Sequence, residues 1–206
     1  MGAGLPPDNR ALFAVFAIAA SCGFLGASRL SGEALECTYV ARETERNPTP
    51  LDQEHQPRGP CATLESDGSV TVHADHLKDL YFADDLAAIL VPAGWFYATS
   101  TGRTAPVLTY DNGADYFEEG LARTIRGGKV GFIDRELTEV IPPTWDFAFP
   151  FVDGLAVVCE GCSSRSVDDE HSEVRGGVWG YVNRSGEVVV PIEYERDDLP
   201  ALPLRQ

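Results

Sequence analysis

The sequence predicts an all-β protein built from tandem antiparallel β-hairpin or meander repeats of about 35 residues, preceded by a hydrophobic leader helix. The first observation is a recurring phrase, since Phe117-Glu-Glu-Gly120-Leu121-Ala122 returns 34 residues later as Phe151-Val-Asp-Gly154-Leu155-Ala156. The second is that turn dipeptides such as Asp67-Gly68 and Ser185-Gly186 precede β-rich runs. The third is composition, because 14 prolines, 20 glycines and one methionine are typical of a turn-rich β protein.

Residues 1–30 are expected to form a signal peptide or a membrane or lipoprotein anchor. An uncharged stretch of 18 residues lies between Arg10 and Arg29, at the lower limit for spanning a bilayer. Cys22 follows Ala19-Ala20-Ser21, which resembles a bacterial lipoprotein box and makes Cys22 a candidate lipidation site. Cleavage at small residues within 26–34 and an uncleaved anchor are the alternatives. Export with membrane attachment is the expectation.

Residues 31–62 are expected to form a proline-rich linker, because the segment is polar and lacks hydrophobic periodicity. Beside Cys22 the chain has an even number of cysteines, which in an exported protein indicates disulfides; they are Cys37, Cys61, Cys159 and Cys162. Three connectivities are possible, and pairing Cys37 with Cys61 and Cys159 with Cys162 is the simplest. The first of these bridges would close the linker.

Residues 63–206 are expected to form the repeat domain. In one unit, residues 130–134 alternate as a strand, residues 135–138 turn the chain, and Val140-Ile141 returns as the partner strand. Pro142-Pro143 ends that partner, because proline cannot donate to a sheet ladder.

A third, apolar strand is expected over residues 155–158, and the glycines before it are expected to supply positive φ or space. One such unit cannot bury its apolar face alone, so the units are expected to stack. The last unit has about fourteen extra residues between 161 and 176, which are predicted to form an exposed loop.

Residues 177–191, with Trp179-Gly180-Tyr181 followed by Val190-Pro191, resemble the unit of the bacterial WG-repeat family. Residues 128–156 are similar to a second unit, and residues 94–122 to a degenerate third in which Phe96 replaces the glycine after tryptophan. Residues 67–88 are a weaker fourth candidate. Eight positions that carry the resemblance are expected to be structural: Trp95, Gly131, Phe132, Asp134, Gly154, Trp179, Gly180 and Tyr181.

The resemblance implies an all-β repeat fold, typically in exported or surface-associated bacterial proteins, and it transfers no catalytic residue. Cys159-Glu160-Gly161-Cys162 is the one motif with possible chemistry of its own. A CxxC pair can be a redox dithiol, half a zinc site or a structural bridge. Because Cys159 ends an apolar strand and does not begin a helix, redox chemistry is disfavoured. A zinc site would need His171 and a carboxylate of residues 168–170, in a spacing that matches no recurrent site.

The formal net charge of −16 disfavours binding to nucleic acid and to anionic lipid, which both need basic residues. His73 and His76 are expected to be surface residues on opposite sides of a strand. No catalytic residue, metal or cofactor is predicted. The leading hypothesis is an exported, non-catalytic scaffold in the bacterial cell envelope, periplasmic or anchored to the membrane through its N-terminal segment, that binds a protein or envelope component. The alternative is a thiol–disulfide or metal-dependent activity centred on Cys159 and Cys162.

Overall fold

The computed structural model describes residues 32–42, 56–66, 68–166 and 172–201, and it confirms the all-β prediction. Contacts divide the chain into Met1–Leu30 and Ser31–Gln206. The first unit, with the expected leader helix and Cys22, lies outside the described residues. Within the described ranges, no helix is long and apolar enough to cross a bilayer.

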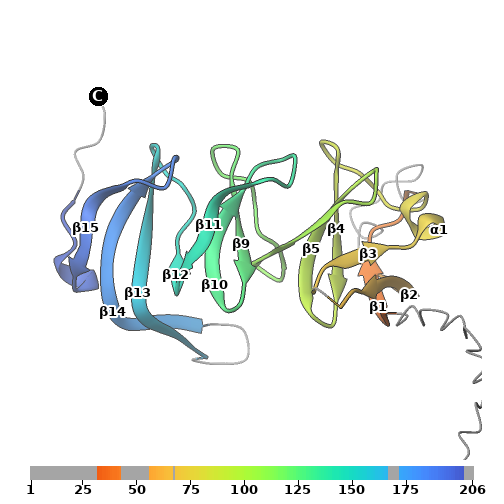
Figure 1. Cartoon of the computed structure of the whole chain (residues 1–206), viewed down its shortest axis with the longest axis horizontal. Coiled ribbons are helices and arrows are strands. Elements are labelled where there is room, and N and C mark those ends of the chain that lie inside the picture. The colour runs from red at the N-terminus through yellow and green to blue at the C-terminus, as the bar shows by residue number, and fades with distance from the viewer. Residues whose placement is uncertain (1–31, 43–55, 67, 167–171, 202–206) are drawn as a thin grey trace, which may run out of the picture. The chain divides into compact units, whose positions relative to one another are not determined.

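Four three-stranded antiparallel meanders make up most of the described part of the chain (Figure 1). In chain order they are β1 (Glu33–Tyr39), β2 (Gln56–Leu64) and β3 (Val70–Val72); β4 (Leu86–Val91), β5 (Gly94–Thr99) and β6 (Thr104–Val107); β9 (Ala122–Arg126), β10 (Lys129–Ile133) and β11 (Glu139–Trp145); and β13 (Leu155–Ser166), β14 (Ser172–Asn183) and β15 (Val188–Tyr194). The first two meanders join through β1 and β4 into one six-stranded sheet, of order β3-β2-β1-β4-β5-β6. The short β12 (Phe147–Ala148) extends the last sheet beside β13, and β7 (Thr109–Tyr110) pairs with β8 (Gly113–Ala114).

The same five-residue turn joins the second and third strands of each meander. Its first residue donates a backbone hydrogen bond to the fifth, and its fourth donates one to the first; the pairs of first and fifth residues are Glu65 and Ser69, Thr99 and Arg103, Asp134 and Thr138, and Asn183 and Glu187. The fourth residue has positive φ in every copy, and it is a glycine except at Leu137, where φ is +58°. Asp134 therefore acts as a turn residue, since its Oδ1 also accepts the Thr138 N–H at 2.7 Å.

The structure corrects the prediction of a linker over residues 31–62. β1 and most of β2 are the first two strands of the first meander, and the predicted boundary at residue 63 falls inside β2. Leu35, Cys37 and Tyr39 alternate into the core, and the prolines of β2 are what made this segment resemble a linker. Those prolines lie where the β1–β2 register is irregular, which is where a sheet tolerates proline.

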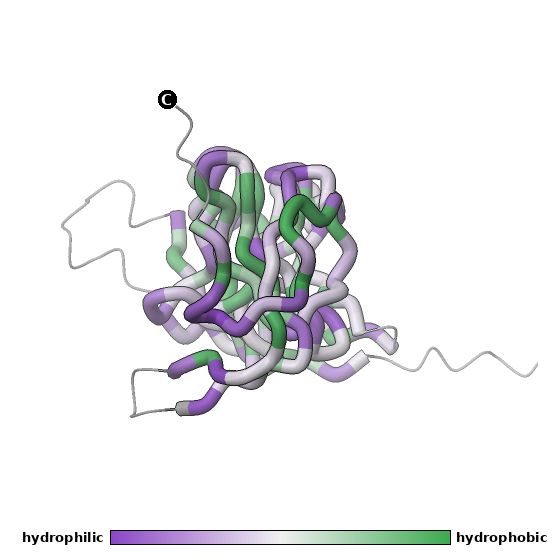
Figure 2. Tube along the Cα trace, turned by 90° about the vertical axis from the view of Figure 1, so that its left-hand side faces the viewer, coloured by the Kyte–Doolittle hydropathy of each residue, from purple (hydrophilic) through white to green (hydrophobic). Residues whose placement is uncertain are grey.

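A hydrophobic core lies between each meander and the next, so the middle strands β5 and β10 have buried side chains on both faces. Trp95 of β5 faces a core shared with Ile133 and Leu137 of the following meander, whereas Phe96 faces the N-terminal core. In β10 the fully buried Phe132 faces the next core and packs on Phe151 with ring centroids 4.7 Å apart. Consecutive residues of a strand point to opposite faces. Trp95 and Phe96 therefore pack into two different cores, and so do Phe132 and Ile133. Figure 2 shows hydrophobic stretches along the strands and hydrophilic residues at several turns.

The glycines of the Trp-Gly motif make room for the neighbouring strand. A Cβ on Gly131 would lie 2.4 Å from the Ile141 carbonyl oxygen and 2.5 Å from the Pro143 nitrogen. A Cβ on Gly180 would lie 2.6 Å from the Val190 carbonyl oxygen. In both meanders the partner strand has a register shift opposite the glycine, which presses its backbone into that space. β5 and β6 pair without such a shift, and there Phe96 occupies the equivalent position.

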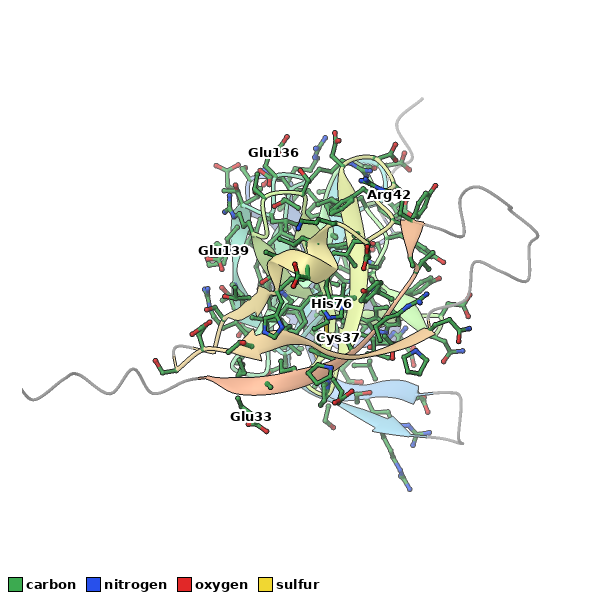
Figure 3. All side chains as sticks on the ribbon, turned by 90° about the vertical axis from the view of Figure 1, so that its right-hand side faces the viewer. Glu33, Cys37, Arg42, His76, Glu136 and Glu139 are labelled. Carbon is green, nitrogen blue, oxygen red and sulfur yellow. A yellow bond between two sulfur atoms is a disulfide. The ribbon has the colours of Figure 1, made fainter. Side chains whose placement is uncertain are left out.

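A short helix, α1 (Ala74–Leu77), follows β3, so the prediction that His73 and His76 lie on a strand is wrong. His73 Nε2 is 2.8 Å from Thr63 Oγ1, and His76 Nδ1 is 2.8 Å from the Tyr39 hydroxyl. Both histidines are half-buried and tie the helix to β1 and β2. Figure 3 shows His76 on α1 and Cys37 on β1 at this end of the fold.

Candidate functional site

Three equivalent two-residue turns lead into the first strands of the last three meanders. They are flanked by the bridged pairs Ala83 and Leu86, Glu118 and Leu121, and Val152 and Leu155. Both central residues of each turn have positive φ, as a type I′ turn requires. Gly154, with φ +80°, therefore has the backbone role that the sequence suggested. We call residues 81–86, 116–121 and 150–155 together the turn row.

An aromatic residue anchors each turn of the row. Phe82 packs against the N-terminal core, Phe117 against the next and Phe151 within the third. The residue before each phenylalanine is Tyr81, Tyr116 or Pro150. Because neighbours in an extended chain point in opposite directions, this preceding residue is directed away from the core. Tyr116 is 54% exposed, which is unusual for a large aromatic side chain.

Two hollows with aromatic walls lie between consecutive turns of the row. The first hollow, of about 400 Å³, is lined by residues of the first two turns, including Tyr81, Asp84 and Tyr116. The second hollow, of about 570 Å³, is lined by residues of the last two turns, including Tyr116, Glu118 and Val152. Tyr116 lines both hollows, so the two are adjacent and are related by one step of the repeat.

Aromatic rings form the walls of both hollows. In the first hollow, Tyr97 and Phe117 have ring centroids 5.2 Å apart, and the Arg135 guanidinium lies 4.9 Å from the centroid of Phe117. In the second, Tyr110 and Tyr116 meet edge to face at 5.5 Å. Tyr110 is 49% exposed and Val152 is 68% exposed. The hollows therefore present aromatic and apolar surface that remains in contact with solvent.

A buried ion pair supports the second hollow from below. Asp115 is 2% exposed and Arg123 is 4% exposed. The Arg123 side chain donates to both carboxylate oxygens of Asp115, at 2.5 and 3.0 Å, and its remaining terminal nitrogen donates to the Ala148 carbonyl at 3.1 Å. Arg123 thereby connects its own meander to β12 of the next sheet. Sequence reasoning missed this pair, because nothing local marks residues 115 and 123 as partners.

Tyr97 connects the first hollow to this ion pair. Its hydroxyl donates to the Asp115 carbonyl oxygen at 2.8 Å. Burial, followed by the nearby Asp115 carboxylate, raises the pKa of Tyr97 to about 12. The phenol is therefore neutral throughout the physiological range and serves as a hydrogen-bond donor in the wall of the hollow.

The rim of the turn row is acidic. It carries five carboxylates, at Asp84, Asp85, Glu118, Glu119 and Asp153, and all five residues are exposed. Asp84 pairs with Arg135 at 2.9 Å, and Glu119 accepts the Gly154 N–H at 3.0 and 3.1 Å, which joins neighbouring turns. The exposed rim is thus a surface of net negative charge over an aromatic floor.

The CxxC motif lies elsewhere, in the C-terminal core. Cys159 and Cys162 form a disulfide, as Cys37 and Cys61 do between β1 and β2, and both pairs are consistent with the simplest predicted connectivity. Cys159 is fully buried and packs with Trp179, whose indole N–H donates to the Gly176 carbonyl at 3.0 Å. A bridge enclosed in this way supports the structural interpretation, since thiol exchange needs an accessible sulfur.

Asp146 secures the strand that carries this disulfide. Its carboxylate accepts the Lys129 ammonium at 2.6 Å and the Gly161 N–H at 2.7 Å. These two hydrogen bonds hold the pKa of Asp146 below its ordinary value. The prediction of an exposed loop over 161–176 is wrong at both ends, because residues 161–166 and 172–176 continue β13 and β14. His171 and residues 168–170 lie outside the described residues.

The remaining motif residues have structural positions. Trp95 and Phe132 lie in inter-sheet cores, and Trp179 lies in the C-terminal core under the Arg196 guanidinium, 5.2 Å from its ring centroid. Tyr181 is half-buried on β14. Among the described residues, no group of three or more His, Cys, Asp and Glu side chains is arranged to hold a metal.

Comparison with known families matches two parts of the chain. Residues 131–161 and 179–196 match the family model described as a WG containing repeat. The matched stretches include the two glycines that face a displaced partner strand, Gly131 and Gly180. No curated protein and no solved structure gives a significant match to the chain.

Proposed function

The chain is a WG-repeat protein, and on that premise we propose that its meanders form a non-catalytic scaffold whose turn row binds a protein or a cell-envelope ligand. The repeats account for the positions of the motif residues, all of which hold turns, cores or strand contacts. We therefore assign the motif residues to folding and the proposed binding to the exposed side chains of the turn row.

The observation that carries the proposal is the exposure of Tyr116 between two hollows. Most large aromatic residues of the described chain lie in cores, but Tyr110 and Tyr116 are about half exposed and stand together. Tyrosine is enriched at the centres of protein interfaces, because it offers a large contact area together with a polar group. A contiguous apolar surface with a polar rim is typical of an interaction site.

Export to the bacterial cell envelope is part of the same proposal. It is supported by the uncharged stretch that precedes the repeats and by the two disulfides, which persist mainly in oxidising compartments. Membrane attachment would then run through the N-terminal segment, with Cys22 as a candidate lipidation site. The net charge of −16 supports a partner other than nucleic acid.

Photo-crosslinking in the native host tests the binding proposal. Benzoylphenylalanine is placed at Tyr116 and, as a matched control, at Val189, which is 49% exposed on β15. A discrete adduct is expected at Tyr116 and absent at Val189, and the identified component should bind the purified full chain and lose affinity with Tyr116→Ala. Equal adducts at both positions, or none at Tyr116, would contradict the proposal.

Intact-mass analysis of the protein from its host tests the location. The mass of an acylated chain that begins at Cys22, with no cysteine open to alkylation before reduction, is the expected result. A full-length chain with one reactive thiol would contradict the lipid anchor at Cys22, and a chain with more than one reactive thiol would contradict the disulfides as well.

A further inference from the structure

We infer that the turn row binds one extended, basic, proline-containing peptide segment whose apolar side chains fill both hollows at the same time. The inference rests on the proposed function and names the chemistry of the partner. Three observations carry it: the repetition of the hollow, the spacing of the sheets, and the charge of the rim.

The two hollows occupy successive positions along the turn row. Each lies between two successive turns of the row and is walled by the aromatic residue that precedes a turn. Tyr116 ends the first hollow and begins the second. A ligand with one apolar group would use only half of this surface, whereas a chain with regularly spaced apolar groups matches it.

The spacing of the meanders favours a peptide in an extended conformation. Sheets that stack face to face lie about 10 Å apart, so equivalent points of neighbouring meanders are separated by about that distance. A polyproline II helix brings every third side chain to the same face and rises about 3.1 Å per residue, which is about 9 Å per turn. A β-strand returns to one face after about 7 Å or 13 Å, which fits less well. Grooves lined by aromatic rings are a known surface for polyproline II segments.

The acidic rim of the turn row favours a positively charged ligand. Asp85, Glu118 and Asp153 make no ion pair with any residue that the structure describes, and all three are exposed. Two arginines, Arg135 and Arg184, lie near five carboxylates, so the row is negative overall. Negatively charged peptides, glycans and nucleic acids are therefore repelled, and lysine or arginine side chains are attracted.

The aromatic floor adds to this preference. The protein itself places a guanidinium over Phe117, at 4.9 Å, and over Tyr110, at 5.8 Å. Among the described residues, no cation lies over Tyr116. Its exposed ring is therefore open to a cationic side chain of the ligand, in a geometry that the same surface already uses.

Fluorescence anisotropy with the full chain tests the inference. The probe is a labelled nonapeptide of three Leu-Pro-Lys units, compared with three Leu-Pro-Glu units and with a single Leu-Pro-Lys tripeptide. Saturable binding of the basic nonapeptide is expected, with the tripeptide at least tenfold weaker and the acidic peptide inactive. Tyr116→Ala should weaken binding at least tenfold, and Tyr116→Phe should retain most of it.

A charge-matched pair of variants separates recognition at the rim from general attraction to an acidic protein. Asp85→Asn with Glu118→Gln should weaken binding severalfold at low salt. Asp197→Asn with Asp198→Asn, on the exposed 3₁₀ helix η2 (Arg196–Asp198), removes the same charge and should leave binding unchanged. Equal weakening by both pairs, or indifference to Tyr116→Ala in a folded variant, would overturn the inference.

A neutral oligosaccharide distinguishes failure of this inference from failure of the proposed function. If chitohexaose binds in a Tyr116-dependent manner and the basic nonapeptide does not, the peptide assignment is wrong and the binding surface stands. If photo-crosslinking at Tyr116 also yields nothing, the proposed function itself is wrong.

Discussion

Substitution of Gly131 by alanine should destabilise the protein far more than an alanine normally does in a strand. The added methyl group would lie 2.4, 2.5 and 2.7 Å from three backbone atoms of residues 141–143. Ordinary van der Waals contact begins at 3.4 Å, so the neighbouring strand would have to move by 1.0 Å. The clashing atoms belong to the backbone of Ile141, Pro142 and Pro143, which cannot rotate away as a flexible side chain can.

Overpacking of this kind typically costs about 1–3 kcal/mol, and we expect about 3 kcal/mol for Gly131→Ala because every clashing atom belongs to the main chain. In a domain of this size, each kcal/mol lowers the melting temperature by about 2–4 °C. The expected decrease is therefore about 6–12 °C. Gly180→Ala should cost somewhat less, since its nearest backbone atoms lie at 2.6, 2.8 and 2.9 Å.

Gly113→Ala is the matched control. Gly113 also lies in a strand and has ordinary φ, and its added methyl group would meet nothing closer than 3.6 Å. Its stability should change by less than about 1 kcal/mol, and in the favourable direction, because alanine restricts the unfolded chain. Thermal and urea denaturation followed by circular dichroism measure all three variants. If Gly131→Ala melts within 2 °C of Gly113→Ala, a difference below about 1 kcal/mol, the close approach of β11 is not what requires glycine.

Three further predictions concern single contacts. Leu137→Ala should lower the free energy of unfolding, measured by urea denaturation, by about 3 kcal/mol, because Leu137 is 4% exposed. Leu137→Gly should recover about 1 kcal/mol of that loss, because glycine adopts the φ of +58° without strain. A glycine variant less stable than the alanine variant would refute this. Asp115→Ala should lower the free energy of unfolding by about 3–5 kcal/mol, because it leaves the Arg123 guanidinium buried and unpaired. The double variant Asp115→Leu with Arg123→Met should lose less, because no charge then remains buried. If the loss in the double variant equals the sum of the losses in the two single variants, the burial of an unpaired charge is not the cause. Burial raises the pKa of Tyr97 to about 12 from 10.0, so the contribution of the neutral phenol to stability is complete below pH 10 and is lost as the pH rises toward 12. Tyr97→Phe should therefore remove this part of the decline in the free energy of unfolding at alkaline pH. The same dependence on pH between 10 and 12 in the variant and in the natural protein would count against this.

Local chemistry made much of the fold predictable. The five-residue turns depend on backbone hydrogen bonds within the turn and on one residue of positive φ, so Gly68, Gly102 and Gly186 mark them directly in the chain. The alternation of 130–134 is likewise a property of the strand alone. These features repeat at nearly constant spacing, and the all-β repeat fold follows from them.

The first meander could not be predicted, because the contacts that define it are not local. β2 contains prolines, which belong in a sheet only where the register is irregular. The prolines therefore indicate a linker as long as the pairing of β1 with β2 is unknown. The extended hairpin of β13 and β14 was missed for a related reason, since its polar residues are typical of a loop when their cross-strand partners are unknown.

The sequence by itself determined the repeat, the glycine-marked turns and the alternation of residues 130–134, because a turn or a strand depends on residues that are close together in the chain. Only the tertiary structure decided which glycine faces a displaced strand, that Asp115 and Arg123 pair in the interior, and that Tyr116 separates two equivalent hollows. Those features arise where one meander meets the next. The contacting atoms are set by how the sheets stack, and no local pattern of residues encodes that stacking.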